Sequence, residues 1–446
     1  MSTTAKKLGF WSLFAIALGN VVGSGIVTLV GQAMEVTGLS AWLSYGVTVI
    51  LGFFTILPFI FIGSAVILRG GEYTVILSML GELPGGIYSI CGITYCITVA
   101  MMGRASAQYI CELIPGLNSQ LVAIVVITIF YIFNMLGVDV MAKVQKFMVW
   151  FLLAALLIFS LLGLTHIGNP DVFNFQSPNF FLGGAAGFTA SIAIFAYSVH
   201  AQYMVINFGA DAKNPRKDIP RVIILVSVIV LVLYVLVGIT ACGVLPFDQA
   251  AGATLLPTSV VLLGKVGGTV FVILGPLFAI FTTLNSYYSA RALPMLRAAK
   301  DGWFPDFISK TNRFGSPTII LTFFWLISVV LLLGGAGIVS LANNLSLVST
   351  LLRLISAFAV IRLPKVFPEA WAKAGLHVPM WLFYLLMGIS FCSLGYIVYL
   401  SFVSLELPVA IANLSVFVIA GLYASYRYKT GKVHIVTAGS IEEISD

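Results

Sequence analysis

Residues 19–26 read GNVVGSGI and lie inside an apolar segment that runs from about residue 8 to residue 33. Each glycine costs a helix about 1 kcal/mol relative to alanine, so Gly19, Gly23 and Gly25 favour a break in this segment. Unwound backbone is tolerated in lipid only where it faces a protein cavity. There its free amides and carbonyls could hold a small zwitterion or an ion, whereas the alternative is that the glycines only let two helices pack closely.

A second apolar segment, residues 184–208, has polar residues at its centre, among them Ser198 and His200. Interruptions in the first and the sixth apolar segments together are the sequence sign of a carrier built from an inverted repeat. A histidine in such a place can contact the substrate or relay a proton, or it can only hydrogen-bond a facing helix.

Arginines within apolar segments form the third group of candidate residues. Arg104 falls in the outer half of the third segment, and Arg353 precedes Arg362 by nine residues, about 14 Å along a helix, which places it near the bilayer centre. A guanidinium inside a membrane costs several kcal/mol unless it is paired or hydrated. Each arginine therefore either locks two helices together or forms an anion-attracting wall of a transport pathway.

The elements that must position these residues are membrane helices. The chain has 446 residues, of which 60% are hydrophobic and 9% charged, against about 25% charged in soluble domains. The five cysteines have no metal-ligand spacing, so we expect buried inert thiols, no bound metal and no cofactor. The sequence predicts an all-α integral membrane protein with about twelve spans, at residues 9–34, 41–67, 85–113, 120–137, 146–164, 184–208, 221–244, 267–293, 317–334, 337–361, 378–402 and 405–427.

The basic residues predict the orientation of these spans. With the N-terminus inside, all but four of the 23 basic residues fall on the cytoplasmic side, Arg69 among them, and the exceptions are Lys265, Arg104, Arg291 and Arg353. We therefore expect a multi-pass plasma-membrane protein with both termini cytoplasmic. The net charge of +7 then implies contact with anionic lipid and needs no nucleic acid.

The chain is expected to form a single membrane domain over residues 1–446. Its parts would be a first repeat at 1–165, a second repeat at 180–365, two additional helices at 378–427 and a cytoplasmic tail at 428–446. No connecting segment reaches the length of about 50 residues that an independent domain needs, and no obligatory protein partner is evident.

Four motifs carry a resemblance to a known superfamily. Residues 19–26 resemble the first-span motif of the amino acid–polyamine–organocation transporters. Three later parts of the chain resemble motifs of the same transporters. They are residues 195–198 (FAYS) together with 213–220 (KNPRKDIP), residues 300–305 (KDGWFP), and residues 349–352 (STLL) together with 359–363 (AVIRL). The resemblance implies a five-plus-five inverted repeat with broken first and sixth helices, followed by two extra helices.

The resemblance also implies a substrate site. Amides around Gly23, Ser24 and Gly25 would receive the carboxylate of an amino acid, and the carbonyls of Val21 and Ser198 would receive its amino group. This agrees with the polarity of half-helix ends. Phe195 stands where the family often has a gating aromatic residue. His200 is added as a candidate wall of the same site.

The sequence does not specify whether transport is coupled to Na⁺, to protons or to no ion. Several relatives carry a lysine in the fifth span, and near that position this chain has Leu152. Hydroxyls of Thr282, Thr283 and Ser286 could ligate Na⁺, His200 could relay a proton, and uncoupled exchange is the third alternative.

No acidic residue is expected deep in a span, which favours neutral amino acids over cationic ones; acidic substrates stay open if Arg104 or Arg353 faces the pathway. A channel would need charged rings or a filter sequence, and an enzyme would need converging nucleophile, base or metal ligands, none of which is evident. The sequence therefore predicts a secondary carrier of small amino acids and not an enzyme. A transport-derived amino acid sensor and a carrier of acidic amino acids or amines are the alternatives.

Overall fold

The computed structural model describes residues 7–68, 70–335, 337–435 and 441–442 of the chain. Arg69 and parts of the predicted tail, 436–440 and 443–446, lie outside the described residues. The first half of the chain consists of the helices α1 (Phe10–Val21), α2 (Ser24–Thr37), η1 (Gly38–Ser40), α3 (Ala41–Ala65), α4 (Gly71–Leu80), α5 (Glu82–Cys91), η2 (Gly92–Tyr95), α6 (Cys96–Leu113), α7 (Ser119–Met135) and α8 (Val138–Thr165).

The second half of the chain begins with the short helix η3 (Pro170–Phe173) and also consists mainly of helices. Its further elements are α9 (Gly184–Ala196), η4 (Ala201–Asp211), α10 (Pro215–Gly243), α11 (Phe247–Ala250), α12 (Leu256–Val272), η5 (Ile273–Leu277), α13 (Phe278–Lys300), η6 (Asp306–Ser309), α14 (Thr318–Leu333), α15 (Ile338–Val360), α16 (Leu363–Val366), α17 (Pro368–Ala372), α18 (Met380–Val403) and α19 (Leu407–Lys429).

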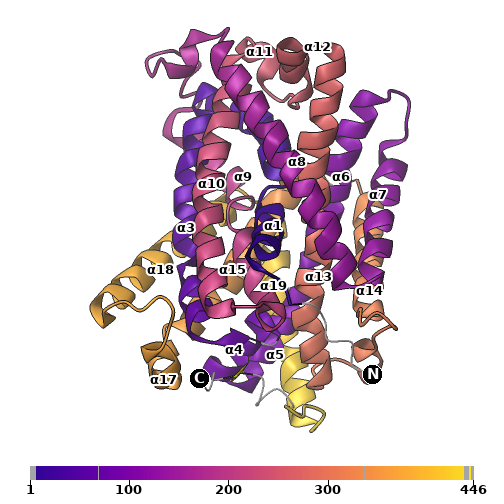
Figure 1. Ribbon diagram of the computed structural model, residues 1–446, viewed down its shortest axis with the longest axis vertical. Coiled ribbons are helices and arrows are strands. Elements are labelled where there is room, and N and C mark those ends of the chain that lie inside the picture. The colour runs from indigo at the N-terminus through magenta and orange to yellow at the C-terminus, as the bar shows by residue number, and fades with distance from the viewer. Residues whose placement is uncertain (1–6, 69, 336, 436–440, 443–446) are drawn as a thin grey trace.

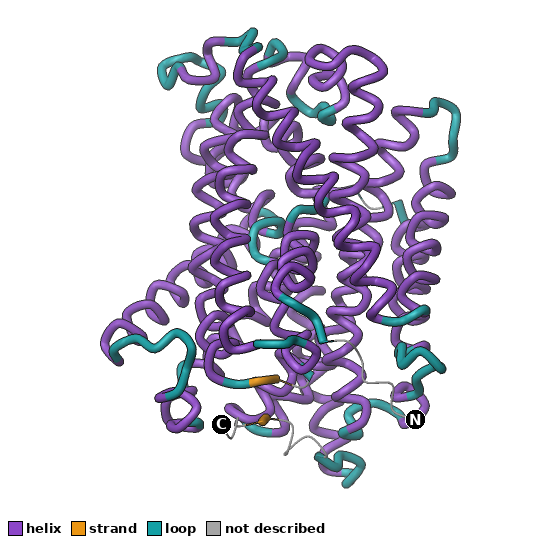
Figure 2. The backbone as a smooth tube through the Cα atoms, viewed as in Figure 1, coloured by secondary structure: helices purple, strands orange, loops and turns teal. Residues whose placement is uncertain are grey.

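The fold is helical throughout the described residues except for one short antiparallel pair. This pair joins β1 (Ile67–Leu68) to β2 (Ile441–Glu442), with Ile67 opposite Glu442. Figure 2 shows how small this strand content is beside the helices. The prediction of an α-helical protein is confirmed, with this minor exception.

Eight segments of the described chain are long and apolar enough to cross a membrane, so the protein is a multi-pass membrane protein. One of them, Phe10–Ala65, contains two predicted spans, and Leu256–Lys300 includes a π-helical turn at η5. Shorter apolar helices are found at Ser119–Met135, Thr318–Leu333 and Asn344–Val360. Each of the twelve predicted segments is helical, whereas the number twelve and the internal repeat remain predictions.

The helix α1 lies near the centre of the molecule and is enclosed by longer helices (Figure 1). It packs against η4, α10, α8 and α13, and α2 packs against α9. The long helices α3 and α10 pack along each other beside this pair, while α18 leans away from the bundle at its periphery (Figure 1). The two interrupted segments are therefore neighbours in the interior, although about 175 residues separate them in the chain.

Local sequence explains where the interior segments turn. Gly38 joins α2 to η1 with φ +73°, a left-handed backbone that favours glycine, and a Cβ there would collide with the carbonyl of Asn179. At the opposite end of the first segment, the amide of Leu8 donates to the carbonyl of Asp211 at 2.7 Å, and Lys213 donates to Leu8 at 2.9 Å. The beginning of the first segment is thus fixed to the end of the sixth.

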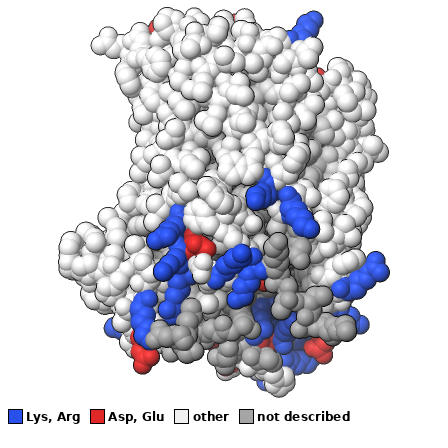
Figure 3. Space-filling view, in the orientation of Figure 1, with Lys and Arg blue, Asp and Glu red and all other residues white. Residues whose placement is uncertain are grey.

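Lys and Arg side chains are concentrated at one end of the molecule, the lower end in Figure 3. Above them lies a broad band with almost no charged side chains on the face shown (Figure 3). This distribution is typical of a protein whose apolar middle is in lipid and whose basic loops lie on one side.

Candidate functional site

The two breaks predicted from the sequence are present and face each other. The first lies between Val21, the last residue of α1, and Ser24, the first residue of α2. The second comprises residues 197–200, between α9 and η4. A Cβ on Gly25 would overlap the side chain of Ser198 and would lie 3.3 Å from the Tyr45 hydroxyl. Glycine is therefore required at this position for the two broken segments to approach each other.

Opposite backbone charges meet at these breaks. Amides at the first turn of α2, which begins at Ser24, have no acceptor within their own helix and form its positive end. The carbonyls of Val21 and Ser198 both accept from the hydroxyl of Tyr234, at 2.7 and 3.3 Å. Each carbonyl keeps a second lone pair, so a cationic group could still bind between them. Tyr234, on α10, gave no signal in the sequence.

A small cavity lies at the breaks. Its volume is about 20 Å³, room for about one water molecule, so it must widen to admit an amino acid. Of the predicted site residues, Val21, Gly23, Gly25, Ser198, His200 and Thr283 line it. The sequence analysis missed the rest of the lining, which consists of Asn20, Thr98, Tyr197, Ala201, Met204, Tyr287, Arg291, Leu345 and Ser349.

Phe195 is not part of the cavity wall. Its ring stacks on that of Tyr45 with the centroids 3.8 Å apart, and the side chain is fully buried. The aromatic residue of this helix end that lines the cavity is Tyr197, two positions later. The two residues point in different directions because Tyr197 still has helical dihedral angles, φ −62° and ψ −35°, and side chains two positions apart on a helix lie on opposite faces.

His200 is buried and lines the cavity. Its Nδ1 lies 2.9 Å from the carbonyl of Ala196. A carbonyl only accepts, so Nδ1 carries the proton and donates it. In the neutral ring, Nε2 is then an acceptor that a substrate group could use.

The three candidate hydroxyls for a cation differ in what they contact. Thr283 donates to the carbonyl of Gly19 at 2.8 Å and lies 3.5 Å from that of Val22. Ser286 donates to the side-chain oxygen of Asn20 at 2.7 Å. Thr282 bonds only to Ala279 of its own helix, at 2.9 Å. Carbonyl and hydroxyl oxygens, the ligands that Na⁺ accepts, therefore gather around Thr283 and not around Thr282.

Gln145, and not Leu152, is the residue of α8 that reaches the first break. A Cβ placed on Gly19 would overlap the side-chain amide of Gln145, whose oxygen accepts from Asn285 at 3.1 Å. Leu152 is two turns further along the helix and is buried in the apolar core. Beside the first break, α8 therefore presents the uncharged amide of Gln145.

The predicted arginines lie in different places. Arg104 lines a second hollow with Thr28, Gln32 and Gln108, and this hollow begins beside the first break, because Thr28 donates to the carbonyl of Ser24 at 2.6 Å. Arg353 is fully buried and donates to the hydroxyls of Thr55 on α3, at 2.9 Å, and Thr350, at 2.7 Å. It is not among the residues that line the cavity.

Two further findings bear on the chemistry of the site. Within the described parts of the chain, no three His, Cys, Asp or Glu side chains are grouped as metal ligands. The five cysteines are free, and Cys91, Cys96 and Cys242 are buried.

A cavity enclosed by two broken helices in the interior of a helical membrane protein is the architecture of a secondary transporter. The chain belongs to the amino acid permease family, a member of the amino acid–polyamine–organocation superfamily, whose profile matches residues 8–424.

Several characterised and uncharacterised proteins are similar to this chain along most of its length. A branched-chain amino acid permease of Bacillus subtilis is 25% identical over 73% of this chain and 74% of its own length. An inner membrane transport protein of Escherichia coli is 24% identical, covering 65% of this chain and 71% of its own. The human cystine/glutamate transporter is 26% identical over 66% of this chain and 61% of its own. The names of the Bacillus subtilis and human relatives state different substrates, so family membership alone does not specify the substrate.

Proposed function

We propose that this protein is a secondary carrier that moves a small α-amino acid across the plasma membrane by alternating access, and that it is not an enzyme. The observation that carries the proposal is the meeting of free amides at the start of α2 with the carbonyls of Val21 and Ser198, because a zwitterion needs both. The substrate carboxylate would bind near Gly23, Ser24 and Gly25, and its amino group near the two carbonyls.

The proposed architecture has twelve spans, with a repeat at 1–165 and another at 180–365, two additional helices and cytoplasmic termini. The packing of α1 on η4 and of α2 on α9 supports a repeat of opposite direction, since each half of one broken segment has a partner half in the other. The grouping of basic side chains at one end supports an orientation with that end in the cytoplasm (Figure 3).

We infer that neutral amino acids are preferred to cationic ones. Glu72 is buried beside the cavity, but its carboxylate is bound to Arg291, which itself lines the cavity. A lysine or arginine side chain would therefore meet a guanidinium and no free carboxylate from Glu72. Acidic amino acids remain the second candidate, favoured by the position of Arg104 in its polar hollow.

A thermal-shift screen of the twenty amino acids tests the substrate class. Bound substrate at 100 times its Kd should stabilise the folded protein by about 2.7 kcal/mol and raise its Tm. We expect the shift with small neutral amino acids. Stabilisation by lysine or arginine alone would contradict the proposed preference.

Coupling is tested by uptake into liposomes under an imposed Na⁺ or pH gradient. If Na⁺ binds the oxygens around Thr283, the Na⁺ gradient should drive accumulation and Thr283→Val should abolish that drive. If His200 relays a proton, the pH gradient should act and His200→Gln should remove its effect. Accumulation driven only by internal substrate would exclude both ions and identify an exchanger.

A further inference from the structure

Glu72 and Arg291 form a buried ion pair beside the cavity. The Nη1 atom of Arg291, on α13, lies 2.6 Å from Oε2 of Glu72, at the start of α4, and the two side chains are 4% and 1% exposed. Arg291 also lines the cavity, whereas Glu72 does not. The pair therefore joins the wall of the cavity to a helix that lies outside it.

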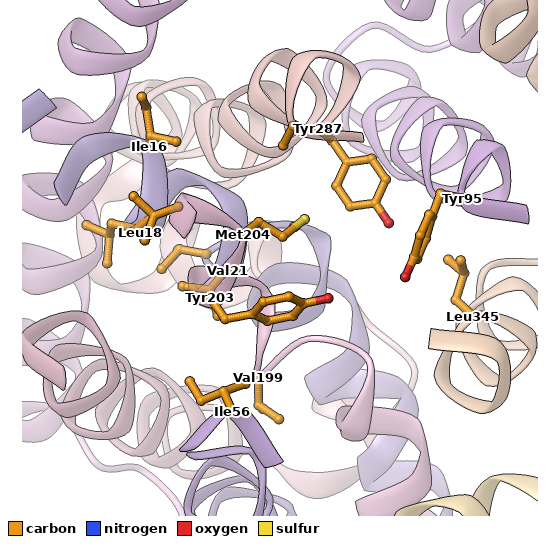
Figure 4. Packing of buried hydrophobic residues seen from close by; sticks show 14 of the residues in the cluster. Ile16, Leu18, Val21, Ile56, Tyr95, Val199, Tyr203, Met204, Tyr287 and Leu345 are labelled. Atoms are coloured by element: carbon orange, nitrogen blue, oxygen red, sulfur yellow. The ribbon is translucent and has the colours of Figure 1, made fainter. Parts of the chain in front are cut away.

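Aromatic side chains enclose the guanidinium. Its central carbon lies 3.6 Å from the centre of the Tyr95 ring, and Nη2 donates to the hydroxyl of Tyr203 at 3.1 Å. Figure 4 shows the hydroxyl ends of Tyr95, Tyr203 and Tyr287 directed toward a common space. Tyr203 belongs to η4 and Tyr95 to η2, so Arg291 holds together four elements that are distant in the chain.

Asn207 makes a second connection among the same elements. From η4, its Nδ2 donates to the carbonyl of Ala290 on α13 at 3.1 Å, and its Oδ1 accepts from the amide of Glu72 on α4 at 3.2 Å. A Cβ on Gly71 would overlap this side chain, so α4 approaches η4 very closely. The contact between α4, η4 and α13 is therefore specific and depends on few side chains.

Glu72, Arg291, Tyr95, Tyr203 and Asn207 therefore form one buried cluster that closes the space between α4, η2, η4 and α13.

The position of the cluster gives its role. The helix η4 begins at the cavity with Ala201 and Met204, and ends at Asp211, beside Leu8, toward the end with the basic loops. Arg291 and Tyr203 lie along this course. We propose that the Glu72–Arg291 pair, with Tyr203 and Asn207, is the gate between the cavity and the basic end of the molecule, opened by parting α4 and η4 from α13. The direction of substrate movement through it rests on the proposed function, but its opening can be measured without substrate.

Cysteine labelling tests the gate in the detergent-solubilised full-length protein. Met204→Cys reports access to the cavity, because Met204 is fully buried behind the cluster. Gln108→Cys reports the second hollow that contains Arg104. The parent chain without either new cysteine gives the background from the native thiols. With Glu72→Gln, we expect labelling of Met204→Cys by a polar thiol reagent to rise at least about tenfold, a change of about 1.4 kcal/mol.

The second reporter separates gate opening from general loosening. We place the hollow at Gln108 at the opposite opening of the same pathway, because Thr28 in its lining bonds the carbonyl of Ser24 at the first break. Alternating access then requires this hollow to become less accessible when the gate opens, so labelling of Gln108→Cys should fall in the same variant. Arg291→Lys, which keeps the charge but loses the fork that binds both Glu72 and Tyr203, should act in the same direction. Asp171→Asn removes a carboxyl of η3 that accepts from Ser177 at 3.0 Å, outside α4, η4 and α13, and should change neither reporter.

Increased labelling of both reporter cysteines would overturn the gate. It would also be overturned if neither Glu72→Gln nor Arg291→Lys increased the labelling of Met204→Cys. Each result is independent of whether an amino acid is the substrate, because no substrate is present in the assay. If the unaltered protein binds no amino acid, that result would count against the proposed function and leave the gate assignment intact.

Discussion

Gly25→Ala is expected to weaken amino acid binding by about 5- to 150-fold. The added methyl group would overlap the side chain of Ser198, and overpacking of this kind costs about 1–3 kcal/mol. The methyl group would hold α2 and the break at Ser198 apart, and the substrate must be held by both at the same time. Binding measured by calorimetry on the purified variant would show the loss.

Two further variants isolate the cause. Ser198→Gly removes the side chain that the methyl group would meet but keeps the carbonyl, so Gly25→Ala with Ser198→Gly should recover much of the affinity. Gly388→Ala adds the same methyl group where no atom lies within 4 Å and should leave binding unchanged. Equal affinities in Gly25→Ala and the unaltered protein would contradict the assignment of the site.

A larger substitution at the same position, Gly25→Leu, is a poorer test of the site. The Cβ that any substitution adds at this position already overlaps Ser198, and the three further carbons of leucine would enlarge the overlap beyond that of alanine. A leucine side chain would force α2 away from the second break. Alanine is therefore the substitution that tests the site.

Arg291→Met is expected to reduce the free energy of unfolding by about 3–5 kcal/mol, since it leaves the carboxylate of Glu72 buried and unpaired. Glu72→Gln with Arg291→Met removes both charges and should recover a large part of this loss. The physical reason is that an isolated charge in a low-dielectric interior costs more than the pair contributes.

Thermal unfolding of the two single variants and the double variant measures this coupling. We expect the double variant to lose clearly less stability than the sum of the two single losses. Additive losses would show that Glu72 and Arg291 do not depend on each other, against the ion pair at 2.6 Å.

Much of the architecture could be predicted because it depends on the local amino-acid composition. Membrane spans need long apolar runs, and glycines in the middle of such a run predict a break, as at Gly23. The second break followed from polar residues around Ser198, and both breaks are where the sequence placed them. The backbone groups of the site could also be predicted, because they are the amides and carbonyls at these two breaks.

Side chains that reach the cavity from distant helices could not be predicted. Tyr234 and Gln145 lie within ordinary membrane helices, and only the packing of those helices brings their polar ends to the breaks. Glu72 lies in a segment that reads as a surface loop, so its burial beside Arg291 depends on the placement of α4. Phe195 was misplaced because the face of α9 that meets Tyr45 is decided by the packing of α9 on α3, which the sequence does not give.

Uptake of a radiolabelled amino acid into proteoliposomes preloaded with the same unlabelled amino acid tests most directly whether this protein is an amino acid carrier. The amino acid with the largest thermal shift would be used, with Gly25→Ala as the matched control. We predict saturable uptake by the unaltered protein that exceeds the uptake by Gly25→Ala. Binding without any uptake would identify a sensor, and uptake that does not saturate would identify a channel; either result would contradict the carrier.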